Sequence, residues 1–67
     1  MVSICVNGVK RQIPHAVTVE KLIELFELKK KSIVLELNHR VVDRNRYAST
    51  RLKQDDTVEI VHFVGGG

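Results

Sequence analysis

The first thirteen residues alternate between apolar and polar positions in the way that is typical of a two-stranded hairpin. Apolar residues occupy every second position from residue 2 to residue 6, which predicts a half-buried strand. The pair Asn7-Gly8 follows, and this dipeptide is the strongest short-range signal for a hairpin turn. Residues 9–13 alternate again and predict the returning strand. Pro14 should end that strand because proline has no N–H to donate to a neighbouring strand.

After Pro14 the apolar residues recur with a helical period. They fall on one face of a helix at positions i, i+3, i+4 and i+7, namely Val19, Leu22, Ile23 and Phe26. Thr18 precedes them and belongs to the residue types preferred at a helix N-cap. The pattern predicts a helix over residues 18–28. Lys29-Lys30-Lys31 would then lie at its C-terminal end, where positive charge suits the helix dipole.

The second half of the chain returns to the period of a strand. Residues 33–37 predict a third strand, Asn38-His39 a turn, and Val41-Val42 a short fourth strand. The polar segment 43–50 predicts a loop with one helical turn, held to the core by Tyr47 and Leu52.

Residues 54–56 predict a further turn, and residues 57–64 predict the last strand. The order of elements indicates an α+β roll, in which a mixed sheet of four to five strands carries one main helix on one face.

The alternation in the last strand predicts an exposed apolar surface. If Val58 and Ile60 face the helix, Val61 and Phe63 face away from it. A domain of 67 residues has little material with which to cover the second face of its sheet. Exposed apolar groups on a small protein often mark a protein interface, which is the interpretation we favour over coverage by a loop or a neighbouring molecule.

The length and composition of the chain argue against an enzyme that works alone, a membrane-spanning protein and a secreted protein. A chain of 67 residues allows one domain, and that domain leaves little material to enclose a deep substrate cleft, so an enzyme that works alone is not expected. No apolar run approaches the roughly 18 residues of a membrane span. The amino terminus has no basic segment followed by an apolar one, so we expect no signal peptide and a cytoplasmic location.

The net charge is +3, which suits an acidic protein partner or a weak nucleic-acid footprint. The basic residues form no single stripe, however, and a solvated surface is the simpler interpretation.

No group of side chains in the sequence has the spacing of a catalytic or metal site. Cys5 is the only cysteine, which excludes an internal disulfide, and no His or Asp is recognisably placed to activate it. We therefore expect a structural thiol, with a nucleophile as the alternative. His15, His39 and His62 lack the spacing of metal ligands, and we predict no metal site. Asp55-Asp56 fits a turn better than a cation site.

The ending of the chain resembles that of a known family. The decapeptide from Val58 to Gly67 is similar to the ending of the ThiS family, the ubiquitin-like sulfur carriers of thiamine biosynthesis. The similarity covers the whole chain and is carried further by the following residues, in the order and spacing of the family: Asn7-Gly8, Thr18-Val19, Leu22-Ile23, Leu37-Asn38, Val41-Val42, Arg44, Tyr47, Thr50 and Leu52.

The chain departs from the family in three places. Ala16 stands where many members have Gly, Gln54-Asp55-Asp56 replaces a frequent Asp-Gly-Asp, and Tyr47 replaces a frequent Trp. Asp tolerates left-handed backbone better than most residues, so the turn at residues 54–56 can survive the loss of glycine.

The resemblance implies a β-grasp domain over residues 1–64 and a flexible glycine tail over residues 65–67. It implies that an activating enzyme of the ubiquitin-activating (ThiF-like) type uses ATP to adenylate the carboxylate of Gly67. Sulfur that a cysteine desulfurase delivers then gives a thiocarboxylate, and a ThiG-like thiazole synthase takes up that sulfur. On this interpretation the chain is a carrier and not an enzyme, and it holds no stable cofactor.

The glycine tail suits this chemistry for a physical reason. Gly65, Gly66 and Gly67 together extend about 10 Å, and their backbone can thread a narrow channel because it carries no side chains. Ordering such a tail costs roughly 1–2 kcal/mol per residue, which contacts on the folded domain must offset. Val61, His62, Phe63 and Val64 are the candidates for that docking surface.

Two other functions remain open from the sequence. One is the small subunit of molybdopterin synthase, which uses the same tail chemistry with another acceptor. The other is a β-grasp binding module, for example for nucleic acid, in which the glycines are only a frayed terminus. Binding by such a module should fall steeply with salt and survive deletion of Gly66 and Gly67, whereas carrier activity should not.

Overall fold

A computed structural model describes residues 1–63 of the chain. It contains a five-stranded sheet in the order β2-β1-β5-β3-β4. The strands are β1 (Val2–Val6), β2 (Val9–Ile13), β3 (Ile33–Leu37), β4 (Arg40–Val41) and β5 (Thr57–His62). The described residues also contain the helix α1 (Val19–Leu25) and two separate single turns of 3₁₀ helix, at Lys30–Ser32 and Arg44–Arg46. The predicted tail at residues 65–67 and the predicted end of the last strand at Val64 lie outside the described residues.

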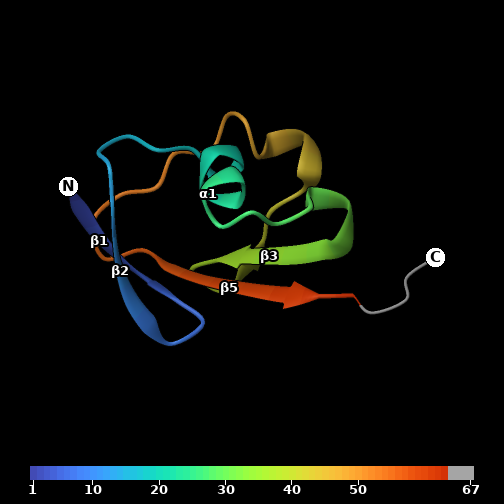
Figure 1. Cartoon of the computed structure of the whole chain (residues 1–67), viewed down its shortest axis with the longest axis horizontal. Helices are drawn as coiled ribbons and strands as arrows, with labels where there is room; N and C mark the ends of the chain where they lie inside the picture. Colours follow the sequence, from blue (N-terminus) through green and yellow to red (C-terminus); the bar gives the residue numbers. More distant parts are fainter. Residues whose placement is uncertain (64–67) are drawn as a thin grey trace.

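The sheet is mixed, as predicted. β1 and β2 form an antiparallel hairpin in which Val6 pairs with Val9 across the Asn7-Gly8 turn. Both turn residues have a positive φ, as a two-residue hairpin turn with the favoured twist requires. β5 runs parallel to β1 and antiparallel to β3, so the last strand lies in the middle of the sheet (Figure 1). This arrangement confirms the predicted α+β roll.

One face of the sheet carries the core. The helix α1 and the connection from β4 to β5 both lie on this face (Figure 1). The core is made of alternate strand residues and one stripe of α1, together with anchors from the loops: Ile4, Val6, Ile13, Val17, Val19, Leu22, Ile23, Ile33, Leu35, Tyr47, Leu52, Val58 and Ile60. Tyr47 and Leu52 are buried, so their predicted role as loop anchors is confirmed. The loop is also tied to α1 by backbone bonds from Val19 to Thr50 and from Glu20 to Tyr47.

The helix is shorter than the sequence predicts. It begins after Thr18, whose hydroxyl accepts a hydrogen bond from the Lys21 N–H, as expected for an N-cap. It ends at Leu25 rather than Leu28, because Glu27 takes a left-handed φ of 56°. The N–H groups of Glu27 and Leu28 then bond back to Glu24 and Ile23, which is the Schellman arrangement.

The early helix end also moves the lysine run away from the expected position. None of Lys29, Lys30 and Lys31 lies in the last turn of α1. Lys30 instead begins a 3₁₀ turn, and its ammonium group contacts Glu20 in the first turn of the helix at 2.8 Å. The predicted dipole contact at the C-terminal end of the helix was therefore wrong.

The short fourth strand is displaced by one residue from the prediction. β4 comprises Arg40–Val41, where the sequence suggested Val41-Val42. Asn38 and His39 both have a positive φ and form the entire turn, so Arg40 pairs directly with Leu37. Val42 then leaves the strand, although its N–H still donates to the Leu35 carbonyl.

Two residues that replace frequent family glycines take left-handed backbone. Ala16 has a φ of 63° and Asp55 a φ of 70°. A side chain at a left-handed position costs roughly 1–2 kcal/mol for most residues, and less for Asp. The fold has therefore kept the turn geometry at both positions although the glycines are absent.

Candidate functional site

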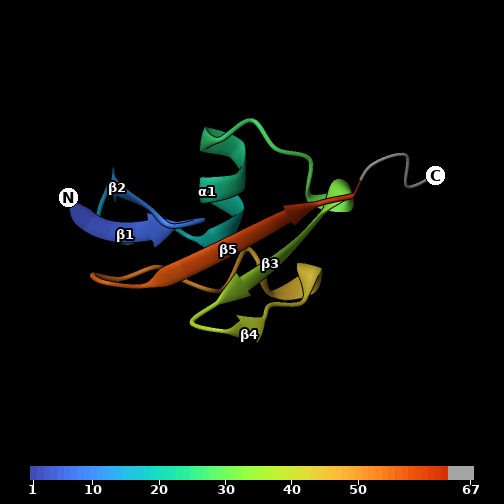
Figure 2. The same cartoon turned by 90° about the horizontal axis from the view of Figure 1, so that it is seen from below.

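The face of the sheet opposite α1 carries an exposed apolar patch at the end of β5. Val61 and Phe63 are 58% and 52% exposed. The strand register adds two residues to the same face, since Val34 of β3 pairs with Val61, and Val41 of β4 pairs with Glu36 two residues further along β3. We call Val34, Val41, Val61 and Phe63 the open-face patch. Within residues 1–63 no element covers this face (Figure 2), so the predicted exposure of Val61 and Phe63 is confirmed.

Two carboxylates lie beside the open-face patch. Glu36 of β3 is directly opposite Glu59 of β5 in the antiparallel register. Like charges in directly opposed positions destabilise a sheet. Neither carboxylate forms an ion pair with any of residues 1–63. Asp43 and Arg44 line the hollow that contains Val34, Val41 and Phe63. The face therefore offers an apolar area with two uncompensated carboxylates on one side and charges of both signs on the other.

The end of β5 is held on both edges of the strand. On the β3 side, the Phe63 N–H donates to the Ser32 carbonyl at 2.8 Å. On the β1 side, the Asn7 amide takes the place of a neighbouring strand at Ile60. Its Oδ1 accepts from the Ile60 N–H at 2.7 Å, and its Nδ2 donates to the Ile60 carbonyl at 3.1 Å. These bonds hold β5 in place on both sides up to Phe63.

Not all of the predicted docking residues can be placed. Val61 and Phe63 lie together on the open face, while His62 is exposed and alternates with them toward the α1 side. Val64, Gly65, Gly66 and Gly67 lie outside the described residues. Sequence reasoning missed Val34 and Val41, because only the strand register places Val34 beside Val61 and Val41 on the same face beyond β3. It also assigned Asn7 only a turn, since nothing local shows a contact with Ile60.

The turn before β5 depends on a buried carboxylate. Asp56 is only 3% exposed and accepts hydrogen bonds from the Lys53 N–H at 2.8 Å and from the Asn38 amide at 3.1 Å. Asn38 in turn accepts from the Thr57 N–H at 2.9 Å. The network joins the β3–β4 turn to the start of β5, so the Asp56 carboxylate has a structural role.

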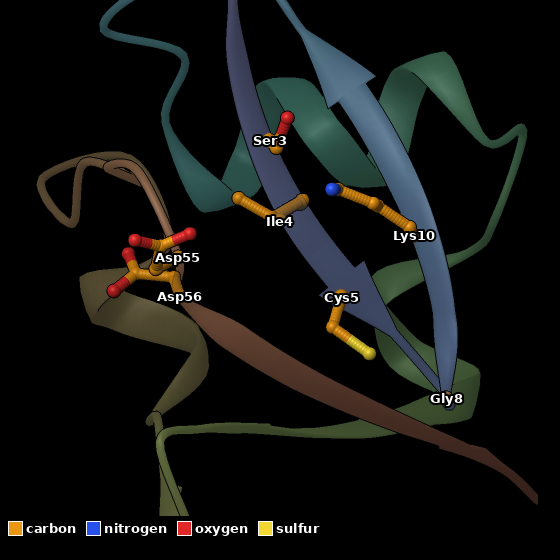
Figure 3. A pocket seen from close by; sticks show the side chains of 7 residues that line it. All are labelled: Ser3, Ile4, Cys5, Gly8, Lys10, Asp55 and Asp56. Atoms are coloured by element: carbon orange, nitrogen blue, oxygen red, sulfur yellow. The ribbon is translucent and has the colours of Figure 1, made fainter.

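A shallow hollow on the open face contains the single thiol. Ser3 and Cys5 lie on β1 and Lys10 on β2, with Asp55 and Asp56 at the turn before β5 (Figure 3). Cys5 is a free, partly exposed cysteine. No histidine lines this hollow, and Asp56 is already bonded to Lys53 and Asn38. Asp55 accepts a hydrogen bond from the Gln54 amide. Among the described residues, the hollow therefore lacks the histidine that most often activates a thiol.

The described part of the chain contains no group of three or more His, Cys, Asp or Glu side chains that could hold a metal ion. In residues 1–63, no helix is long and apolar enough to cross a membrane. Burial raises the pKa of the Tyr47 hydroxyl, a rise that Arg44 opposes and Asp43 reinforces. Tyr47 is part of the core beneath the loop, so this shift reflects packing.

Comparison with known proteins agrees with the geometry. The family model described as the ThiS family matches residues 4–67. The sulfur carrier protein ThiS of Bacillus subtilis is 38% identical over 50 residues, which are 75% of this chain and 76% of that protein. A crystal structure of the thiamine biosynthesis protein ThiS from Geobacter metallireducens superposes with a TM-score of 0.85 at 28% identity, covering 98% of this chain and all of that one.

A second kind of relative is longer. The thiazole synthase of Magnetococcus marinus is 34% identical over 61 residues, which are 91% of this chain but only 19% of that protein. The thiazole synthase of Paramagnetospirillum magneticum is 32% identical over 62 residues, again 19% of its length. In both, a segment that is similar to this chain is part of the same polypeptide as the rest of the synthase.

Proposed function

Because this chain belongs to the ThiS family, the sulfur carriers of thiamine biosynthesis, we propose that it carries sulfur as a thiocarboxylate on Gly67. The family match supports this proposal, since it extends from residue 4 to residue 67 and so includes β5 and all three glycines. The match to a solved ThiS structure over 98% of the chain supports the same β-grasp scaffold.

A carboxylate must be activated before sulfur can replace one of its oxygens. Its negative charge repels nucleophiles, and oxide is a poor leaving group. In the proposed cycle the Gly67 carboxylate attacks the α-phosphorus of ATP and displaces pyrophosphate, which gives an acyl adenylate. A sulfur nucleophile then attacks the acyl carbon and displaces AMP. Because a cysteine desulfurase hands on its sulfur as a persulfide, this attack leaves an acyl disulfide. A thiol, for example that of free cysteine, then attacks the donor's sulfur and breaks the S–S bond; the donor leaves as a mixed disulfide, and the tail ends in a thiocarboxylate that is nucleophilic at sulfur.

The proposed partners supply each catalytic step. A ThiF-like activating enzyme uses the ATP, and a cysteine desulfurase is the indirect source of sulfur. A thiazole synthase is the acceptor, which the two longer relatives support because they join a similar segment to a thiazole synthase. The chain itself is a co-substrate and not an enzyme, and it binds no cofactor stably. We propose a cytoplasmic location for the chain and these partners.

The open-face patch is the proposed docking surface. Val61 and Phe63 lie immediately before the tail, together with His62 and Val64 of the predicted set. Complete burial of a fully exposed valine or phenylalanine side chain contributes about 1.5–3 kcal/mol. Val61 and Phe63 are 58% and 52% exposed, so covering each contributes about half of that range and offsets part of the entropy lost when the glycines are ordered. Glu36 and Glu59 add negative charge that a basic residue of the activating enzyme can meet.

The proposal is tested by the intact mass of the protein. The chain is incubated with a ThiF-like enzyme, ATP, cysteine and a cysteine desulfurase. A mass gain that corresponds to exchange of one oxygen for sulfur is expected, and it should be absent after deletion of Gly67. The Cys5→Ser variant should still show the gain, which excludes sulfur bound to the thiol. No gain, with the enzyme active on a control carrier, would refute the proposal.

The docking surface has its own matched pair of variants. Phe63→Asp places a charge on the open-face patch, whereas Leu25→Asp places one on the exposed side of α1, where Leu25 is similarly exposed at 48%. We expect Phe63→Asp to raise the KM of the activating enzyme for the carrier at least tenfold, and Leu25→Asp to leave it within about twofold. Equal effects of the two variants would place the docking surface elsewhere.

A further inference from the structure

The β1-side edge of β5 becomes free just before the tail. Along β5 the backbone groups of even-numbered residues point toward β1: the Asp56 and Val58 carbonyls accept from Cys5 and Asn7, and Ile60 bonds with the Asn7 side chain. Odd-numbered residues point toward β3, as the Phe63 bond to Ser32 shows. By this alternation the N–H and C=O of His62 point to the β1 side.

Nothing in residues 1–63 pairs with this edge at His62. The parallel ladder between β1 and β5 stops at Val6 and Val58 because β1 turns away at Asn7-Gly8. Asn7 then fills the next position at Ile60 with its side chain. The first free backbone pair along this edge therefore belongs to His62. An unpaired strand edge is a template for another strand.

A groove on the α1 side follows the same edge. It has a volume of about 210 Å³, and its walls come from the hairpin, the C-terminal end of α1 and β5. Val9, Phe26 and Leu28 give it an apolar floor, and Arg11 and His62 also line it. The Arg11 guanidinium lies 5.5 Å from the centre of the Phe26 ring. No carboxylate lines the groove, and Arg11 forms no ion pair with the described residues.

We propose that the free edge of β5 at His62 receives an extended, carboxylate-bearing segment of the activating enzyme as an added strand. This inference rests on the proposed function, because it assumes that the enzyme must hold the tail. A strand paired at His62 is continuous with the tail and would keep it extended into the active site. The apolar floor takes an alternate side chain of that strand, and Arg11 takes its carboxylate. Asn7 blocks pairing further back along β5.

One substitution removes the outward N–H without breaking a hydrogen bond within the sheet. His62→Pro deletes an N–H that points away from β3, so no bond within the sheet is lost. His62→Ala removes the same side chain but keeps the N–H and is the matched control. We expect His62→Pro to weaken binding of the activating enzyme about tenfold more than His62→Ala, the effect of losing one hydrogen bond. Equal binding of the two variants would overturn the proposal.

A second pair of variants tests the charge in the groove. Arg11→Glu reverses the charge beside the proposed strand, and Lys21→Glu makes the same change of net charge on the exposed surface of α1, where the Lys21 side chain is 58% exposed. Arg11→Glu should weaken binding about fivefold or more, and Lys21→Glu less than twofold. Equal effects of the two variants would show that only the overall charge matters and would count against the groove.

The wild-type chain gives a measurement that does not depend on any variant. The His62 amide should exchange with solvent quickly in the free chain and become protected when the activating enzyme is bound. Unchanged exchange in the complex would overturn the inference. Protection that appears in the free chain on raising its concentration would also overturn it, because a second copy would then be the occupant.

The two proposals fail in different ways. Binding and amide exchange report on the edge, whereas the gain of sulfur reports on the carrier function. An enzyme that binds and protects His62 without producing the thiocarboxylate would support the edge and refute the function. Sulfur transfer without protection of His62 would support the carrier function and refute the added strand at the edge.

Discussion

Replacement of Asn7 by glycine tests how the end of β5 is held. The Asn7→Gly change removes both bonds between the side-chain amide and the Ile60 backbone, at 2.7 and 3.1 Å. The backbone at residue 7 has a φ of 49°, which glycine adopts without strain, so the loss reports on the amide. At a net 0.5–1.5 kcal/mol for each hydrogen bond, unfolding should become easier by about 1–3 kcal/mol.

His39→Gly is the matched control for Asn7→Gly. His39 also occupies a two-residue turn with a positive φ, of 70°, but its side chain forms no hydrogen bond with the described residues. Glycine should relieve left-handed strain there, so we expect a change of less than about 1 kcal/mol, in the stabilising direction.

Thermal unfolding followed by circular dichroism measures both variants. For a domain of this size 1 kcal/mol corresponds to about 4–8 °C in Tm, so Asn7→Gly should lower Tm clearly while His39→Gly should not. Amide exchange should locate the loss, because the Ile60 N–H loses its acceptor while Phe63 keeps its bond to Ser32. Equal Tm shifts in the two variants, or continued protection of Ile60 in Asn7→Gly, would refute the reasoning.

Three further changes test other parts of the fold. Ala16→Gly should raise stability by about 0.5–1 kcal/mol in urea denaturation, because glycine relieves a φ of 63°; a loss would show that the turn is unstrained. Asp56→Ala should cost about 2–4 kcal/mol by the same assay, since it leaves the Lys53 N–H and the Asn38 amide without their acceptor. The raised pKa of Tyr47 means that the unfolded chain ionises first, so this residue's contribution to stability falls as pH rises through about 10. The stability of Tyr47→Phe relative to the wild type should therefore increase between pH 9 and pH 11, and a constant difference would contradict the shift.

The conflict between Glu36 and Glu59 suggests why the open face is not optimised for the free chain. Two opposed carboxylates destabilise a sheet by a few tenths of a kcal/mol up to about 1 kcal/mol, and the apolar side chains of Val61 and Phe63 remain in water beside them. A basic and partly apolar partner that covered the face would relieve both costs. The proposed docking of the activating enzyme on the open-face patch would offset this cost.

The local pattern of the sequence determined the elements and the exposed face. The two-residue period placed β1, β2, β3 and the start of β5, and the alternation in β5 put Val61 and Phe63 opposite the helix. The Asn7-Gly8 turn followed from residue type alone. These predictions succeed because a strand's alternation and a turn's φ depend on neighbouring residues. The docking role of Val61, His62, Phe63 and Val64 and the chemistry of Gly67 stay predictions.

Tertiary structure decided the contacts between residues that are distant in sequence. Asn7 reaches Ile60, 53 residues later, because β5 returns parallel to β1. Val34 joins Val61 only through the antiparallel register. The end of α1 at Leu25 was decided by backbone geometry at Glu27, a residue type that gives no stop signal. Pairing across a sheet depends on how whole strands are placed, and this placement is fixed by packing of the complete core. The free edge at His62 cannot be recognised from the sequence, because it depends on where β1 stops pairing with β5.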